Sequence, residues 1–205
     1  MIAIEAAPRR GGAAVSVRLR SGRRFVISPA QLSRMALAAG DSVDADTAAG
    51  LVEAALELRT ERRLLRLLAG RARSRAELEH RLAEWEVPPE LGRRLLDRLH
   101  QAGLLDDSRM ARELSESLAR RGHGSLRAAH DLLRLGVDGE AAAAAVEGHR
   151  DRDLAAAQAL VITRFGAPPY DPRTARRASG LLARRGFDAD TAAAALAAED
   201  LYAGP

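Results

Sequence analysis

Leucines recur at helical spacing through the stretch from Arg73 to Gly124, between polar residues that typically start helices. Leu78 and Leu82 place an apolar stripe on one face of a helix that follows Ser74. We expect Ser74 to be the N-cap of that helix, because Glu77 three residues later completes a capping box. Short one-sided helices are unstable alone, so this pattern predicts helices that pack on each other.

Prolines and glycines mark the ends of these helices. Pro88-Pro89 ends the first helix and begins the second, because the residue before a proline avoids the helical region. Gly103 closes the second helix, as glycine commonly does just past a helix end. Asp106 or Asp107 then caps a third helix that runs to Arg121.

The pattern repeats with a period of 50 residues. Matched apolar positions are Leu82, Leu132 and Leu182; Val87, Val137 and Phe187; and Leu96, Val146 and Leu196. Such a period predicts a mainly α protein of three tandem three-helix repeats, helix-turn-helix-like and stacked in an elongated curved array. We expect four segments: 1–45 with a basic β-hairpin and short helix, then three-helix units at 46–104, 105–149 and 150–205.

The N-terminal segment has the alternation of a half-buried β-strand. Val15, Val17 and Leu19 alternate with polar residues, and Ser21-Gly22 is a two-residue turn signal before a second strand at 23–27. Residues 2–4 add a third short strand, and a brief helix begins at Ser28-Pro29.

Basic charge gathers in the same segment. All 32 basic side chains are arginine, and residues 1–40 have a balance of +6 while the remaining 165 residues have −2. Arginine carries a planar set of donors that suits phosphates and carboxylates. The position of this charge favours contact with an anionic partner.

Candidate chemistry is sparse. The chain has no cysteine, and its five histidines form no metal-ligand pattern and are expected at the surface. Asp106 and Asp107 are better explained as a helix cap and a partner of the helix dipole than as a catalytic pair. We therefore expect no enzyme, no metal and no cofactor. No signal peptide or membrane span is evident, which favours a cytoplasmic monomer without membrane contact.

The central stretch has a recognisable set of residues: Arg71-Ala72-Arg73-Ser74 before Glu77-Leu78 and Leu82, then Gly103-Leu104-Leu105-Asp106-Asp107, then Ala111 and Glu116-Ser117, and Arg120 with Gly122, Gly124, Ser125 and Leu126. In these residues it resembles the RecX family of bacterial recombination regulators. Met110 stands where the family usually has a bulkier apolar or aromatic residue, and arginines stand for many lysines. The N-terminal hairpin, the long connecting helix and the repeats extend the resemblance to nearly the whole chain.

The resemblance implies a non-enzymatic protein that binds the RecA recombinase. RecX proteins lie in the groove of the RecA filament on single-stranded DNA and restrain its recombinase, ATPase and co-protease activities. Ser74, Leu78, Leu82, Gly103, Asp106 and Asp107 are then structural residues.

Ten arginines are candidates for contact with RecA or with single- or double-stranded DNA. They surround the hairpin turn, precede the helix after Ser74, or flank Gly122-His123-Gly124: Arg18, Arg20, Arg23, Arg24, Arg71, Arg73, Arg75, Arg120, Arg121 and Arg127. The competing interpretation is a solvated strand face for the first four and favourable positive charge at helix C-termini for most of the others.

A helix-turn-helix transcriptional regulator that binds DNA is the alternative function. Recognition helices need side chains that read base edges, and only 89–102 carries them, with Arg93, Arg94, Arg98 and Gln101. One such helix does not account for three repeats.

Overall fold

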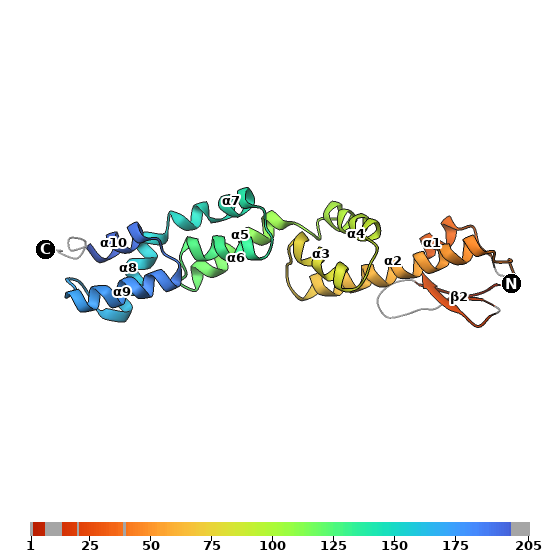
Figure 1. Cartoon of the computed structure of the whole chain (residues 1–205), viewed down its shortest axis with the longest axis horizontal. Coiled ribbons are helices and arrows are strands. Elements are labelled where there is room, and N and C mark those ends of the chain that lie inside the picture. The colour runs from red at the N-terminus through yellow and green to blue at the C-terminus, as the bar shows by residue number, and fades with distance from the viewer. Residues whose placement is uncertain (1, 7–13, 20, 39, 198–205) are drawn as a thin grey trace. The chain divides into compact units, whose positions relative to one another are not determined.

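Three strands and ten helices make up the described part of the chain (Figure 1). The structure is a computed structural model and describes residues 2–6, 14–19, 21–38 and 40–197. The predicted mainly α class with tandem three-helix repeats behind a small β segment is confirmed. The chain divides into two compact units: residues 1–71 with 82–98, and residues 72–81 with 99–205.

The first unit begins with a three-stranded antiparallel sheet in the order β1-β2-β3. Its strands are β1 (Ile2–Ala6), β2 (Val15–Leu19) and β3 (Arg24–Ile27). At the turn between β2 and β3 the Leu19 N–H donates to the Arg23 carbonyl over 2.8 Å, and Gly22 adopts a φ of +84°. The predicted hairpin and third strand are both present.

The core of this segment lies between the sheet and two helices, α1 (Pro29–Arg34) and α2 (Ala45–Gly70). Val17 and Ile27 of the sheet pack against Leu51 and Ala54 of α2, and the first three are fully buried. A hairpin alone is marginally stable, so this apolar contact holds the sheet in place.

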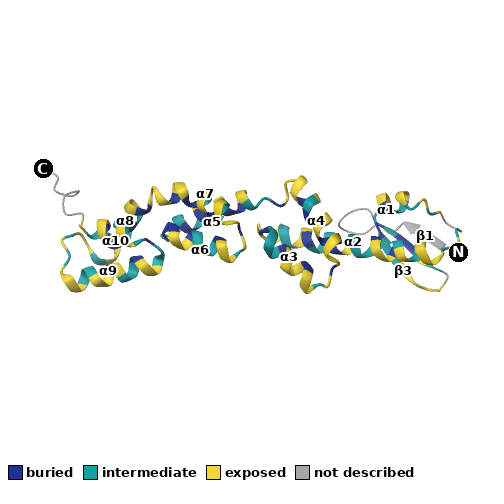
Figure 2. Ribbon diagram, turned by 45° about the horizontal axis from the view of Figure 1, so that its top comes forward, coloured by how far each residue is buried: buried dark blue, intermediate teal, exposed yellow. Residues whose placement is uncertain are grey.

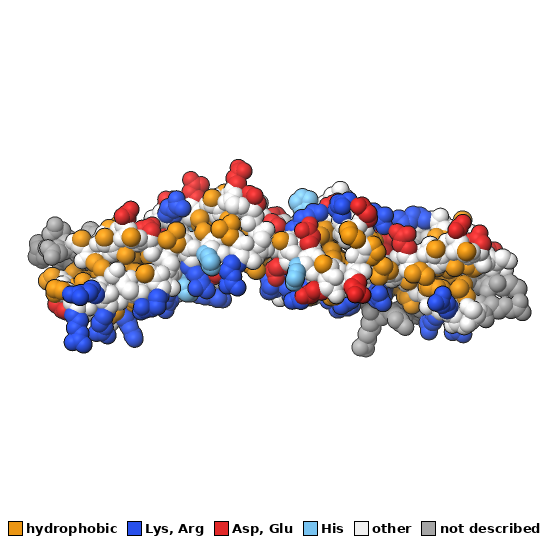
Figure 3. All heavy atoms as spheres, in the orientation of Figure 1, with side chains coloured by type: hydrophobic (Ala, Val, Ile, Leu, Met, Phe, Trp, Pro, Cys, Tyr) orange, Lys and Arg blue, Asp and Glu red, His pale blue; other side chains and the backbone are white. Residues whose placement is uncertain are grey.

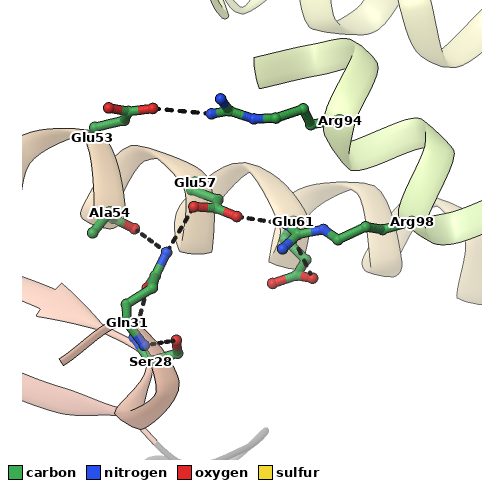
Figure 4. Close-up of polar contacts among 8 residues, drawn as sticks. All are labelled: Ser28, Gln31, Glu53, Ala54, Glu57, Glu61, Arg94 and Arg98. Atoms are coloured by element: carbon green, nitrogen blue, oxygen red, sulfur yellow. Dashed lines mark hydrogen bonds and ion pairs between the residues drawn. The ribbon is translucent and has the colours of Figure 1, made fainter. Parts of the chain in front are cut away.

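Gln31 ties α1 to α2 (Figure 4). Gln31 and Ser28 form a reciprocal capping box at the start of α1. The Gln31 side chain is buried, and its Nε2 donates to the Ala54 carbonyl over 3.2 Å and to the Glu57 carboxylate over 2.9 Å.

One face of α2 is acidic and receives arginines from α4 (Pro89–Gln101). Arg94 lies 2.9 Å from Glu53, and Arg98 lies 2.7 Å from Glu57 and 3.8 Å from Glu61; Figure 4 shows these side chains pointing toward one another. The three glutamates are four residues apart, so they form one row along the helix.

Leu82, near the end of α3 (Arg75–Glu84), is buried and fixes the approach of α4 in the first unit. A Cβ on Gly92 would lie 3.2 Å from the Leu82 Cδ1 atom. Glycine at this position therefore lets the backbone of α4 approach the Leu82 side chain closely.

The second unit contains two successive three-helix groups. The first is α5 (Asp107–Arg120), α6 (Ser125–Arg134) and α7 (Gly139–Arg150); the second is α8 (Asp153–Phe165), α9 (Pro172–Arg185) and α10 (Ala189–Ala197). Each group has its own apolar cluster, with Leu132 fully buried in one and Leu182 in the other. Figure 2 shows the buried residues along one side of these helices and exposed residues along the other.

The turn after the second helix is the same in all three repeats. Val87, Val137 and Phe187 each donate a backbone N–H to the carbonyl five residues earlier, over 3.0 to 3.1 Å. The residue before each adopts a positive φ: Glu86 at +54°, Gly136 at +75° and Gly186 at +83°. The first repeat thus keeps the left-handed turn without a glycine.

Consecutive repeats join at the start of a second helix within the second unit. The Ser74 hydroxyl caps α3 by accepting from the Glu77 N–H over 3.1 Å, and it donates to the Leu135 carbonyl. Fifty residues later the Gly124 N–H donates to the Arg185 carbonyl over 2.9 Å. In both joints, the loop after the second helix of one repeat lies against the beginning of the second helix of the preceding repeat.

These joints require glycine. A Cβ on Gly136 would lie 2.4 Å from the Ala76 Cβ, and a Cβ on Gly124 would lie 2.2 Å from the Gly186 carbonyl oxygen. Both distances are shorter than any van der Waals contact.

One histidine is not at the surface, and the expectation of surface histidines is wrong for it. His149 is 3% exposed, with its Nδ1 at 3.2 Å from the Ser115 hydroxyl and its Nε2 at 2.8 Å from the His123 carbonyl. Burial of a polar ring is tolerated because both nitrogens have partners.

Candidate partner-binding surfaces

The hairpin arginines lie on β2, on β3 and at the turn between them. Arg18 stands opposite Arg24 in the register of the two strands, and both side chains are exposed, as is Arg23 at the turn. The Arg24 Nε donates to the Ser16 hydroxyl over 2.6 Å, which fixes its guanidinium against the sheet. Arg20 lies outside the described residues.

An open groove of about 590 Å³ runs between β3 and α2. Apolar side chains of both elements form its floor, and four arginines are among its lining residues. The lining consists of Arg24, Phe25 and Val26 from β3, and Val52, Ala55, Leu56, Leu58, Arg59, Arg62 and Arg66 from α2. Arg24 thus belongs to a cluster whose other arginines come from a helix 35 or more residues later.

The arginines around the start of α3 are partly neutralised. Arg71 is the C-cap of α2 and is exposed. Arg73 lies 3.3 Å from Glu77, and Arg75 lies 3.0 Å from Glu79. The exposed Arg75–Glu79 pair contributes only about 0.2–1 kcal/mol, so an anionic partner can displace it.

Asp106 and Asp107 have separate structural partners. The Asp106 carboxylate caps α5 by accepting from the Arg109 N–H over 2.8 Å, and this bond lowers the pKa of Asp106. The Asp107 carboxylate accepts from the Arg75 N–H over 2.9 Å at the start of α3. Burial raises the pKa of Asp107, although the bond from Arg75 acts in the opposite direction.

The arginines at the end of α5 and the start of α6 lie around a loop that also contacts α9. Arg120 lies 3.8 Å from Glu116, and Arg127 lies 2.9 Å from Asp131. The Arg121 carbonyl accepts from the Arg185 guanidinium over 3.1 Å. Burial, with Arg185 and Arg127 nearby, lowers the pKa of His123 in this loop.

A further basic surface covers α9, where Figure 3 shows arginine side chains gathered. Its exposed members are Arg173, Arg176, Arg177 and Arg184. The Arg177 guanidinium lies 5.6 Å from the centroid of the Phe165 ring, within the range of a cation–π interaction.

Sequence reasoning missed both the α2 and the α9 arginines. Arg59, Arg62 and Arg66 are spaced three and four residues apart, a signal that they share one helix face. That signal alone does not reveal the strand that completes the groove, because the pairing of β3 with α2 is a long-range contact.

The described residues contain no group of three or more histidine, aspartate or glutamate side chains placed to hold a metal ion. Within the same part of the chain, every helix is too short or too polar to span a bilayer.

The sequence is similar to regulatory proteins of one family. The family model "RecX, first three-helix domain" matches residues 62–99. The Regulatory protein RecX of Halorhodospira halophila is 41% identical over 144 residues, covering 69% of this chain and 89% of that protein. The Regulatory protein RecX of Stenotrophomonas maltophilia strain R551-3 is 38% identical over 130 residues, covering 63% of this chain and 80% of that protein.

Solved structures share the fold. A crystal structure of regulatory protein RecX matches with a TM-score of 0.73 and 21% identity, covering 93% of this chain and 95% of that one. The structure of RecX from Lactobacillus salivarius matches with a TM-score of 0.62 and 17% identity, covering 68% of this chain and 94% of the other.

Proposed function

We propose, since this chain belongs to the RecX family of regulatory proteins, that it binds the RecA filament on single-stranded DNA and inhibits the filament by occupying its groove. RecA's recombinase, ATPase and co-protease activities are all restrained in this proposal. The observation that carries it is the 41% identity over 144 residues to a Regulatory protein RecX, of which this chain covers 89%. The protein acts in the cytoplasm as a monomer without a cofactor.

The repeat architecture supports binding rather than chemistry. Helical repeats join through local contacts such as Ser74 with Leu135, and tandem repeats typically form extended binding surfaces. The candidate arginines lie at repeat joints and on the hairpin, where they can meet phosphates or acidic side chains.

RecA-catalysed ATP hydrolysis on single-stranded DNA tests this proposal. We expect substoichiometric amounts of the protein to lower the hydrolysis rate, with less inhibition as salt rises, because surface charge pairs are screened. Dependence on filament length distinguishes capping of filament ends from coating of the groove. An unchanged rate at equimolar protein contradicts the proposal.

The hairpin arginines have their own test. Replacing Arg18, Arg20, Arg23 and Arg24 with serine is expected to weaken filament binding while the helical circular dichroism stays unchanged. A matched control replaces four exposed arginines elsewhere with serine: Arg93, Arg109, Arg112 and Arg134. Equal filament binding by the hairpin variant and the wild type would remove the hairpin from the mechanism.

The helix-turn-helix alternative rests on the arginines of α4. Each has an acidic partner: Arg94 with Glu53, Arg98 with Glu57, and Arg93 with Glu90 at 2.7 Å. These arginines are largely exposed, so a DNA phosphate or base can displace such pairs, as at the start of α3. Tight binding to duplex DNA together with no effect on RecA would favour that alternative.

A further inference from the structure

The groove between β3 and α2 combines apolar lining residues with arginines that have no acidic partner in the described part of the chain, and it lies beside a strand edge. Within the described residues, neither Arg59, Arg62 nor Arg66 forms an ion pair, and no acidic residue lines the groove. The glutamates of α2 belong to a different face, which receives Arg94 and Arg98 (Figure 4). One helix therefore presents an acidic face to its own chain and a basic face to this groove.

We propose that this groove binds an extended acidic peptide segment of a partner protein. The assignment follows from the chemistry of the groove alone and does not depend on whether the partner is RecA.

The dimensions of the groove suit an extended chain. Its α2 lining spans Val52 to Arg66, a rise of roughly 21 Å at about 1.5 Å per residue. About six residues of an extended peptide cover that length at about 3.3 Å each. Arg62 and Arg66 are separated by about 6 Å along the helix axis, close to the spacing of alternate side chains on one face of a strand.

The apolar floor of the groove favours a peptide that has apolar side chains between its acidic side chains. Val52, Ala55 and Leu56 of α2 are aliphatic, and Val52 is 50% exposed. An extended peptide directs successive side chains to opposite faces, so alternating carboxylates and aliphatic groups meet the arginines and the floor at once.

Two features favour a peptide over a single-stranded nucleic acid. Binding of bases normally uses exposed aromatic rings as stacking platforms, and the only aromatic lining residue, Phe25, is half-buried against the sheet core. β3 is also an edge strand, paired with β2 alone among the described strands. Edge strands accept extended peptides through main-chain hydrogen bonds.

Among the described residues that line the groove, Arg24 is the one arginine that comes from the sheet. Its Nε donates to the Ser16 hydroxyl over 2.6 Å, which fixes its side chain over β2. The three arginines of α2 therefore supply most of the charge that meets the peptide.

Fluorescence anisotropy with the full-length protein tests the proposal. The probe is a labelled synthetic peptide of about twelve residues with glutamate at alternate positions and alanine, valine or leucine between them; the control peptide carries glutamine for every glutamate. We expect saturable binding of the glutamate peptide, roughly tenfold tighter than that of the glutamine peptide, because charge-assisted bonds to arginine are lost in the latter.

Variants locate the binding. The triple variant Arg59→Ser, Arg62→Ser and Arg66→Ser is expected to weaken glutamate-peptide binding by roughly tenfold. The matched control, Arg112→Ser, Arg134→Ser and Arg176→Ser, removes three exposed arginines from other helices and should leave affinity unchanged. Val52→Glu adds a negative charge to the floor at an exposed site and should also weaken binding.

Three results would overturn the proposal. The first is equal affinity for the glutamate and glutamine peptides. The second is equal loss in the triple variant and in its matched control, with circular dichroism unchanged in both. The third is tighter binding of a single-stranded oligothymidine that competes for the same three arginines, which would assign the groove to nucleic acid. A variant that inhibits RecA normally but no longer binds the peptide separates this groove from the proposed regulatory function.

Discussion

The buried carboxylate of Asp153 accepts the backbone N–H of Ser125 over 3.0 Å, although 28 residues separate them. Asp107 does the same for Arg75, so the first residue of α8 binds the start of α6 as the first residue of α5 binds the start of α3. The first N–H groups of a helix have no partner within it. In both cases the first helix of the following repeat supplies that partner.

Removal of the Asp153 carboxylate should destabilise the second unit. Asp153→Ala leaves the buried N–H of Ser125 without its acceptor, and such a loss costs about 1–3 kcal/mol. The urea midpoint, followed by far-UV circular dichroism, measures the change. Asp151→Ala, at a nearby exposed aspartate, is the control and should shift the midpoint little. Equal midpoints for the two variants would mean that the Asp153 bond contributes nothing.

A comparison of alanine substitutions at two glycines distinguishes the cost of steric overlap from the cost of backbone strain. Gly136→Ala and Gly103→Ala both place a side chain at positive φ, +75° and +67° respectively, which costs about 1–2 kcal/mol. A Cβ on Gly103 meets nothing within 4 Å, whereas one on Gly136 overlaps Ala76. We therefore expect Gly136→Ala to destabilise by about 1–3 kcal/mol more than Gly103→Ala. Thermal denaturation of both proteins gives the difference, and a similar loss for each would place the whole effect in the backbone.

Glu86 offers a stabilising substitution. Its φ of +54° is a conformation that glycine adopts without steric strain, so Glu86→Gly should raise stability by about 1 kcal/mol. Equilibrium unfolding in urea measures the gain. Glu79→Gly is the control, since it puts glycine at an exposed position inside α3 and should lower stability. A loss of stability in Glu86→Gly would show that its side chain contributes more than the strain removes.

The cap at Asp106 should act only above acid pH. Asp106→Ala removes the acceptor of the Arg109 N–H and should cost about 0.5–2 kcal/mol at neutral pH. The pKa of Asp106 is lowered in the folded chain, so its contribution is present above the unfolded value of 3.8 and is lost as the pH falls through the folded value. Urea midpoints of variant and wild type, measured from pH 7 down to about 3, should therefore converge in acid. A constant difference across that range would contradict the assignment.

Local signals in the sequence predicted much of the fold. Ser74 and Asp106 cap their helices as expected from their positions before apolar stripes. The 50-residue period places Leu82, Leu132 and Leu182 in buried positions, because burial repeats wherever the helix stripe repeats.

Features that depend on distant contacts escaped prediction. Nothing near Asp107 in the sequence indicates that its partner is the N–H of Arg75, 32 residues earlier. The sequence around His149 gives no sign of burial, because its partners, the Ser115 hydroxyl and the His123 carbonyl, are distant in the chain. The ten predicted arginines stay predictions as contact residues, and the grouping of Arg24 with Arg59, Arg62 and Arg66 emerges only when β3 meets α2. The four predicted segment boundaries likewise stay predictions.

The 26 residues of α2 fix the direction in which side chains at one end of the helix point relative to those at the other end. Leu51 near its start is fixed against the sheet, while Arg62 and Arg66 follow more than two turns later. A single residue inserted after Leu58 would rotate everything beyond it by about 100° relative to the sheet, since a helix has about 3.6 residues per turn. Arg62 and Arg66 would leave the groove. Arg94 and Arg98, which also follow the insertion, would turn away from Glu53 and Glu57. An insertion of seven residues would restore the direction of these side chains to within about 20°, but it would move them about 10 Å further along the helix axis. The length of this helix is thus as constrained as its side chains.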